Sequence, residues 1–217
     1  MPYENPISYS GKSLYRKCPF LWYDNYILGN RRPSGSAADR GVYLHELLES
    51  FFKGEAPYPS GNRALAPWQP FMERLAAYNP TAEGEVAVTK EWQRCDFDDP
   101  EARFRGKKDL DIEAGRTLML FDWKSGKVYP DHEGQGKMYA ALSPGYDKYV
   151  TFFVYLDIPF YIQRWEYTAE EVDAERLELE AEAELIRNDT EFLPTPGDHC
   201  KWCHMSWRNG GDCKRAP

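Results

Sequence analysis

Apolar residues recur along the chain with two spacings, which predict strands alternating with helices. Strands are expected where apolar and polar residues alternate or where short apolar runs occur, at residues 83–92, 104–114, 117–123, 149–157 and 161–168. Helices are expected where apolar positions recur three and four residues apart, at residues 8–28, 39–52, 68–78, 132–142 and 169–187.

The composition is that of a globular protein. The 217 residues are 42% apolar, enough for one substantial domain with a full core. No apolar run approaches the roughly 18 residues that span a membrane. The N-terminus also lacks the apolar region of a signal peptide. We therefore expect a cytoplasmic protein, in the host cytoplasm if a phage encodes it.

The net charge of −8 does not exclude nucleic acid as a partner. Residues 168–191 carry ten acidic and two basic side chains, so the rest of the chain is neutral as a whole. The acidity belongs to one expected helix, and local basic patches elsewhere can hold DNA.

Charged side chains gather on the central expected hairpin. Side chains alternate faces along a strand, so Asp122 and Lys124 share one face, and Asp109 and Asp111 share another. If the two strands pair, carboxylates and an ammonium group converge on one spot. Such a spot suits Mg²⁺ or Mn²⁺ beside a phosphate.

Two details favour a functional hairpin over a solvated one with ordinary surface charges. Residues 117–121 form a nearly continuous apolar run, which is typical of a buried strand. Gly106 lies three residues before Asp109, where a missing side chain lets a backbone or ligand approach closely.

Two further patterns belong either to the same site or to ordinary packing. His45 lies on the expected helix 39–52, and a helical histidine is either a packing residue or a metal ligand. The outcome depends on whether this helix covers the hairpin. Gln135 and Tyr139 share a helical face, as site residues or as a capping glutamine and a core tyrosine.

The cysteines indicate a metal site, because disulfides are rare in cytosolic proteins. Cys200 and Cys203 have metal-ligand spacing, and Cys213 follows in the same irregular tail. Cys18 is either a buried thiol or the fourth ligand. Four thiolates suit zinc or an iron–sulfur cluster, which would staple the first helix to the tail. Cys95 has no expected ligand role.

The triplet Gly11-Lys12-Ser13 does not complete a nucleotide-binding loop. Such a loop needs a glycine at position 6, which is Pro6. We therefore expect no ATPase in this chain, and any helicase that works with it is a separate protein.

Taken in order, these motifs resemble the RecB-type branch of the PD-(D/E)xK nuclease superfamily. The likeness is strongest to its iron–sulfur members: the CRISPR-associated RecB-like exonucleases of the Cas-four type, the nuclease domain of AddB, and phage relatives. It spans nearly the whole chain and rests on Cys18, His45, Gly106 with Asp109, Asp122 with Lys124, Gln135 with Tyr139, and the three tail cysteines.

The resemblance implies a restriction-endonuclease-like α/β fold, with a central mixed sheet of about five strands flanked by helices. It also implies a single domain over 1–217, in which residues 38–187 form the nuclease core. Residues 1–30 and 194–217 would hold a [4Fe–4S] cluster on Cys18, Cys200, Cys203 and Cys213, with Zn²⁺ as the alternative.

The resemblance also implies roles for the site residues. His45, Asp109, Asp122 and the carbonyl of Trp123 would hold Mg²⁺ or Mn²⁺. Lys124 would position the attacking water or stabilise developing charge, with Gln135 and Tyr139 orienting the lysine or contacting phosphates. Contacts to the DNA backbone are expected from Arg16, Lys17, Arg31, Arg32, Lys107 and Lys127. Tyr15, Trp22 and Tyr23 would either stack on bases or pack in the core.

Two positions depart from the family pattern. Lys108 stands where relatives carry an apolar residue, which predicts that this strand lies nearer the surface. Nine residues separate Cys203 from Cys213, a wide spacing that leaves room for His204 as a substitute ligand and for zinc.

The implied function is a metal-dependent DNA exonuclease that acts on DNA ends in recombination, repair, phage replication or CRISPR adaptation. Its partners would be DNA, single-stranded or with free ends, and separate recombination, helicase or CRISPR adaptation proteins. One alternative is a non-catalytic DNA-binding or adaptor module. Another is a zinc-stapled protein-interaction domain whose acidic helix 169–187 binds a basic partner.

Overall fold

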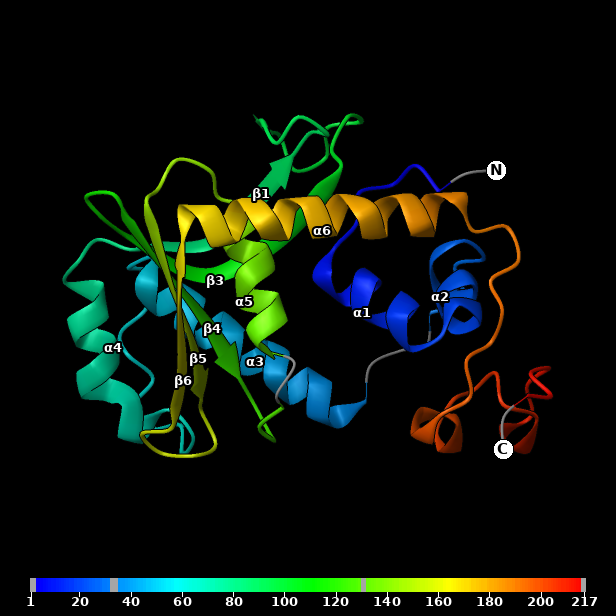
Figure 1. The fold of residues 1–217 in the computed structure, drawn as a ribbon. Coiled ribbons are helices and arrows are strands. Elements are labelled where there is room, and N and C mark those ends of the chain that lie inside the picture. Colours follow the sequence, from blue (N-terminus) through cyan, green and yellow to red (C-terminus); the bar gives the residue numbers. More distant parts are fainter. Residues whose placement is uncertain (1–2, 32–34, 130–131, 216–217) are drawn as a thin grey trace. The chain divides into compact units, whose positions relative to one another are not determined.

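The computed structural model describes residues 3–31, 35–129 and 132–215 (Figure 1). The chain divides into two compact units. We call residues 34–179 the sheet body, and residues 1–33 together with 180–217 the cysteine module. The single domain expected over 1–217 stays a prediction.

A six-stranded mixed sheet forms the sheet body, with the order β2-β1-β3-β4-β5-β6. Strands β4 and β5 run parallel, and the other neighbouring pairs are antiparallel. This confirms the α/β fold and adds a short sixth strand that no apolar period reveals. The strands are β1 (Thr81–Val88), β2 (Arg94–Cys95), β3 (Phe104–Ala114), β4 (Thr117–Lys124), β5 (Lys148–Tyr155) and β6 (Ile162–Thr168).

Strand β4 lies inside the sheet, between β3 and β5. Its apolar run is buried as expected, since Leu118 and Phe121 are at most 4% exposed. Gly115 makes the tight β3–β4 turn with φ +61°, a left-handed conformation that glycine adopts without strain. The parallel β5 then requires a crossover, which contains α5 (His132–Ala141).

Helices cover both faces of this sheet (Figure 1). On one face, α3 (Ser36–Phe52), the short turn Ala66–Trp68 and α4 (Gln69–Ala76) pack on the strands. Their core includes Leu44, Leu48, Trp68, Leu110 and Trp123. On the other face, α5 approaches β5 so closely that a Cβ on Gly136 would lie 2.8 Å from Thr151 Oγ1.

Strand β3 breaks the alternation of faces that the sequence predicts. The β1–β3 ladder pairs Ala82 with Leu110 and Gly84 with Lys108, but skips the residues between them, Glu83 and Asp109. Glu83 has φ +51°, which explains the interruption.

The interruption overturns two expectations. Asp109 and Asp111 do not share an environment, because Asp111 forms an ion pair with Lys108, at 3.0 Å between Nζ and Oδ1. Lys108 is therefore not near the surface: it is 6% exposed. Gly84 makes room for the pair, since a Cβ there would lie 3.0 Å from Asp111 Oδ1. A buried charge needs such a partner.

In the cysteine module, the expected single helix 8–28 is wrong. The segment forms α1 (Tyr9–Lys17) and α2 (Pro19–Tyr26). Cys18 between them is extended, with φ −164° and ψ 105°, because a residue before proline avoids the helical conformation. Pro19 then starts the second helix, where its missing N–H costs nothing.

The longest described helix is α6 (Ala169–Asn188), whose residues from 180 onward belong to the cysteine module. The tail beyond it forms two short 3₁₀ turns, Asp198–Lys201 and Trp207–Asn209. Within the described ranges, none of the helices combines the length and apolarity needed to cross a bilayer.

Candidate functional site

Helix α3 covers the acidic hairpin and places His45 against it. His45 Nδ1 lies 3.1 Å from Asp109 Oδ1, and His45 Nε2 lies 2.8 Å from the Trp123 carbonyl oxygen. Asp109 Oδ2 also accepts a hydrogen bond of 2.6 Å from the Trp123 N–H. Three of the expected metal ligands therefore meet at one point.

The start of α3 is anchored close to this point. Arg40 forms a bidentate ion pair with Asp157, which also accepts a hydrogen bond of 2.8 Å from the Gly126 N–H. Gly41 allows close packing, because a Cβ there would lie 3.0 Å from Ser125 Oγ. These contacts hold the helix against the segment that follows β4.

Sequence reasoning missed Glu83. Within the described part of the chain, the one set of three or more candidate ligands whose ligand atoms lie within 4.8 Å of one another is His45, Glu83 and Asp109. Glu83 reaches this set because it lies opposite Asp109 at the interruption of the ladder. The strand register that reveals it is not visible in a single sequence, and its positive φ is the kind of strain that functional sites hold.

The protonation of His45 and Glu83 reflects their shared environment. Burial lowers the pKa of His45, but the hydrogen bond and charge of Asp109, together with the Asp122 charge, outweigh it and raise that pKa to about 9. Burial raises the pKa of Glu83, and the nearby carboxylates of Asp109 and Glu49 raise it further. Excess negative charge therefore surrounds this cluster.

A second group of polar residues surrounds Asp122. Lys124 Nζ lies 2.5 Å from Asp122 Oδ1 and donates a hydrogen bond of 2.8 Å to Gln135 Oε1. Gln135 Nε2 donates to Asp122 Oδ2 at 2.8 Å and to the Tyr139 hydroxyl at 2.9 Å. The structure thus brings together the expected lysine, aspartate, glutamine and tyrosine.

Gly106 is needed beside Tyr139. A Cβ on Gly106 would lie 2.8 Å from Tyr139 Cε1, so only glycine lets this ring pack on β3. Burial raises the pKa of Tyr139, and the Asp122 charge raises it further, so the hydroxyl stays protonated at neutral pH.

Asp122 is buried, and this burial raises its pKa although the Lys124 charge lowers it. Among the described residues, its Oδ1 atom accepts no well-aligned hydrogen bond despite the nearby ammonium. Asp122 lies outside the 4.8 Å set. The two groups are nevertheless adjacent, because Asp122 and Lys124 flank Trp123, whose backbone binds Asp109 and His45.

The basic residues expected to contact DNA have different surroundings. Lys107 lines a groove of about 520 Å³ beside His45 and Asp109, and is paired with Glu85 at 2.7 Å. Lys127 is exposed. In the cysteine module, Lys17 and Arg31 are exposed, Arg16 is paired with Glu182, and Arg32 lies outside the described residues.

The aromatic residues of the N-terminal segment mostly pack among themselves. Trp22 is 1% exposed and contacts the rings of Tyr3, Tyr15, Tyr26 and Phe192. Trp22 is therefore a core residue.

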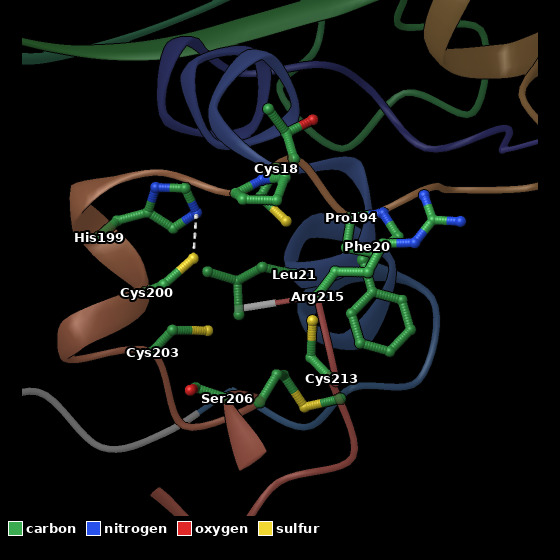
Figure 2. Close-up of a pocket in the computed structure, with 13 residues that line it drawn as sticks. Cys18, Phe20, Leu21, Pro194, His199, Cys200, Cys203, Ser206, Cys213 and Arg215 are labelled. Carbon is green, nitrogen blue, oxygen red and sulfur yellow. Dashed lines mark hydrogen bonds between the residues drawn. The ribbon is translucent and has the colours of Figure 1, made fainter. Parts of the chain in front are cut away.

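Four cysteines line one pocket of the cysteine module, with their sulfur atoms turned toward a common space (Figure 2). Cys18 and Cys200 are buried, and Cys203 and Cys213 are half-buried. Cys213 reaches the other tail cysteines through a bridge to Ser206 and a hydrogen bond of 2.7 Å from its N–H to the Met205 carbonyl. These contacts fold the nine residues between Cys203 and Cys213 back, so that Cys213 lies at the same pocket as the other cysteines.

Backbone N–H groups surround these sulfur atoms. The Gly197 N–H donates to Cys200 Sγ at 3.4 Å. Burial raises the pKa of the Cys203 thiol, while backbone hydrogen bonds from Met205 and Ser206 lower it. Such donors stabilise a thiolate that binds a metal.

The expected substitute ligand, His204, does not line this pocket. Its Nε2 atom bonds Asp24 Oδ2 at 2.8 Å, which engages it elsewhere. The histidine at the pocket is His199, whose Nε2 lies 3.8 Å from Cys200 Sγ. His204 is therefore not the ligand that the wide cysteine spacing suggested.

Comparisons with known proteins identify the family and show related folds. Residues 6–208 match the family model of the PD-(D/E)XK nuclease superfamily. Among solved structures, the fold resembles SSO0001, with 17% identity and a TM-score of 0.54 over 95% of this chain and 86% of that one. It also resembles a protein named "Putative exonuclease" from Eubacterium rectale, with 12% identity and a TM-score of 0.57 over 95% of this chain and 88% of that one. No curated protein gives a significant match. The chain belongs to the PD-(D/E)XK nuclease superfamily.

Proposed function

We propose that this protein is a metal-dependent DNA exonuclease that hydrolyses phosphodiester bonds from DNA ends. Membership of the nuclease superfamily supports nuclease chemistry. The likeness to a protein named as an exonuclease supports the choice of exonuclease. Such an activity would serve recombination, repair, phage replication or CRISPR adaptation.

One observation carries the proposal: a single backbone unit, Trp123, joins two chemically different groups. Its N–H and C=O hold Asp109 and His45, while its neighbours Asp122 and Lys124 lie on either side. Candidate metal ligands and a lysine ammonium thereby lie at the same end of β4. Both promote phosphodiester hydrolysis, the metal by polarising the phosphate and the ammonium by stabilising the charge that develops on it.

The donor set fits a divalent cation. We assign His45, Glu83, Asp109, Asp122 and the Trp123 carbonyl as its ligands, adding Glu83 to the set expected from the sequence. Carboxylate and carbonyl oxygens suit Mg²⁺ and Mn²⁺. Two further observations support the assignment: the carboxylates of Asp109 and Glu49 raise the pKa of Glu83, and the carboxylate of Asp122 is buried.

When bound, such an ion supplies Lewis acidity to the scissile phosphate and lowers the pKa of a bound water. The protein supplies orientation. Lys124 donates to Gln135 Oε1 and faces Asp122, so its remaining hydrogens can hold a water or a phosphate oxygen. Gln135, fixed by Asp122 and Tyr139, keeps the ammonium from rotating away.

For the cysteine pocket we propose a [4Fe–4S] cluster held by Cys18, Cys200, Cys203 and Cys213. A single zinc ion at about 2.3 Å from each sulfur would bring all four to about 3.8 Å of one another. Within the described chain, these cysteines form no set of three within 4.8 Å. In a cluster each thiolate binds a different iron, so the wider spacing supports iron–sulfur over zinc. Its role would be structural.

The test is time-resolved digestion of DNA labelled at the 5′ or 3′ end, single- and double-stranded, with Mn²⁺, Mg²⁺ or neither. We expect metal-dependent loss of nucleotides from an end, and no cleavage of a circular single strand. Cleavage of the circle would contradict the exonuclease assignment. Binding without cleavage in every metal would favour a non-catalytic DNA-binding module.

A further inference from the structure

The cysteine module contains a second groove that the nuclease mechanism does not use. It is an open groove with a volume of about 700 Å³, and its lining includes Lys17, Leu21, Asn25, Arg31 and Trp202. We propose that this groove binds single-stranded DNA, with Trp202 stacking on an unpaired base and Lys17 and Arg31 contacting phosphates. The inference takes from the proposed function only that DNA is the substrate.

Trp202 is unusual because it is 80% exposed. Large aromatic side chains normally bury most of their surface, and an exposed one in a groove indicates a binding site. Within the described residues, its ring makes no aromatic contact. The face of the indole is therefore open to a ligand.

The backbone that carries Trp202 is held in place. Asn209 Nδ2 donates to the carbonyls on both sides of it, at 3.2 Å to Lys201 O and 2.9 Å to Cys203 O. The Trp202 N–H donates to His199 O at 3.1 Å. A fixed backbone with an exposed indole loses little entropy on binding, which is what a stacking platform needs.

The charges of the groove favour an anionic ligand. Among the described residues, neither Lys17 nor Arg31 forms an ion pair, and the Arg31 guanidinium is held 4.1 Å from the centre of the Tyr26 ring. The acidic residues here are already paired: Asp198 with Lys201 at 2.9 Å, and Asp24 with His204. Two cations are thus left to meet phosphates.

The exposed indole selects single strands over duplexes. Bases in a duplex are stacked on each other, so an indole reaches a base face only where the strand is unpaired. Basic side chains beside an aromatic platform are the general arrangement for single-strand binding without sequence preference. We therefore assign an unstructured DNA strand as the occupant, in preference to a duplex.

The experiment measures binding of a dye-labelled oligothymidine by fluorescence anisotropy. The full chain carries Lys124→Ala and is kept free of added divalent metal, so that no cleavage interferes. We expect Trp202→Ala to weaken binding about tenfold, in line with the loss of one stacked base. Trp202→Phe, which keeps an aromatic face, should stay within about threefold of the parent.

The matched control is Trp207→Ala. Trp207 is 54% exposed in the same tail but does not line the groove, so its removal should leave affinity unchanged. Lys17→Ala and Arg31→Ala should each weaken binding equally for different sequences and reduce its salt dependence. Absorption spectra of every variant check that the cysteine site is intact, because Trp202 lies between Cys200 and Cys203.

Equal affinities of the Trp202→Ala and Trp207→Ala proteins would overturn the proposal, as would equal losses for single-stranded and blunt duplex DNA. The experiments distinguish failure of the nuclease assignment from failure of the proposed single-strand groove. A protein that never cuts DNA but loses oligothymidine binding with Trp202→Ala refutes the nuclease assignment alone. A protein that cuts DNA with Trp202→Ala binding normally refutes the groove alone.

Discussion

Glu83 and Asp109 lie opposite each other on β1 and β3, with ligand atoms within 4.8 Å of each other and of His45. Like charges at opposing positions on neighbouring strands destabilise a sheet. The sheet body therefore holds a repulsion between Glu83 and Asp109, which the protonated His45 offsets in part and a bound cation would relieve further.

Replacing Glu83 should affect the stability of the metal-free protein and its metal binding in opposite directions. Glu83→Gln removes the repulsion while keeping the shape, so we expect a Tm without metal equal to or above that of the wild type. The stabilisation produced by added Mn²⁺ should be smaller, because one ligand is lost. Differential scanning fluorimetry measures both. The control is Glu91→Gln, at an exposed residue outside the cluster, which should leave the Mn²⁺ response unchanged.

Lys124→Ala should reduce DNA cleavage by at least about 100-fold while leaving Mn²⁺ binding nearly intact. The reason is that Lys124 contacts Asp122 and Gln135 but is no metal ligand. Initial rates on end-labelled DNA and calorimetric Mn²⁺ titration give the two readouts. Lys90→Ala, at an exposed lysine of the sheet body with no expected role, serves as the control. Full activity of Lys124→Ala would defeat the assignment of this site.

Gly106→Ala should harm both stability and activity. The added Cβ would lie 2.8 Å from the Tyr139 ring, which must move and take its contact with Gln135 along. Overpacking of this kind costs about 1–3 kcal/mol of unfolding free energy. Gly61→Ala is the matched control, because a Cβ on Gly61 meets nothing within 4 Å. Thermal unfolding and cleavage rates should change only for Gly106→Ala.

The raised pKa of His45 predicts how stability without metal depends on pH. The folded pKa of about 9 exceeds the ordinary 6.5, so the native state binds the proton more tightly. The stabilisation is thus fully present below about pH 6.5 and is lost as the pH rises through about 9. The Tm advantage of wild type over His45→Gln should shrink by about 5 °C across this window.

The same proton competes with the metal, because a protonated imidazole cannot bind an ion. Mn²⁺ affinity should therefore rise with pH between about 6 and 9 in the wild type. His45→Gln should bind Mn²⁺ more weakly, with little dependence on pH. Titration of Mn²⁺ at several pH values measures both; a flat profile in the wild type would argue against His45 as a ligand.

The cysteine pocket has an optical test. Protein purified without oxygen should be brown, with a broad absorption near roughly 400 nm that reductant changes, and zinc protein should be colourless. Cys213→Ser should remove this absorption and lower the Tm. Cys95→Ser should do neither, since Cys95 lies on β2 outside the pocket. Stoichiometric zinc in colourless anaerobic protein would contradict the cluster.

Most of the candidate site was predictable because it follows strand and helix periods. Asp122 and Lys124 are two residues apart on a buried strand, and Gln135 and Tyr139 are four apart on a helix. Their contacts with one another follow once α5 packs on β4 and β5.

Features that depend on irregular backbone were not predictable. Glu83 reaches Asp109, and Lys108 reaches Asp111, only because the β1–β3 ladder is interrupted at a residue with positive φ. Pro19 indicates the break between α1 and α2, but the apolar pattern continues across it and predicts a single helix. The sequence does not indicate that Trp202 is exposed, because the exposure of this residue depends on how the irregular tail folds.

The double role of Trp123 has a consequence for how such enzymes diverge. Its C=O and N–H bind His45 and Asp109, while its ring stacks on Phe52 at 5.9 Å between centroids. Any bulky apolar residue could fill that space, and proline alone would delete the N–H. The side chain at this position can therefore change without loss of the backbone contacts to Asp109 and His45, provided that its shape fits.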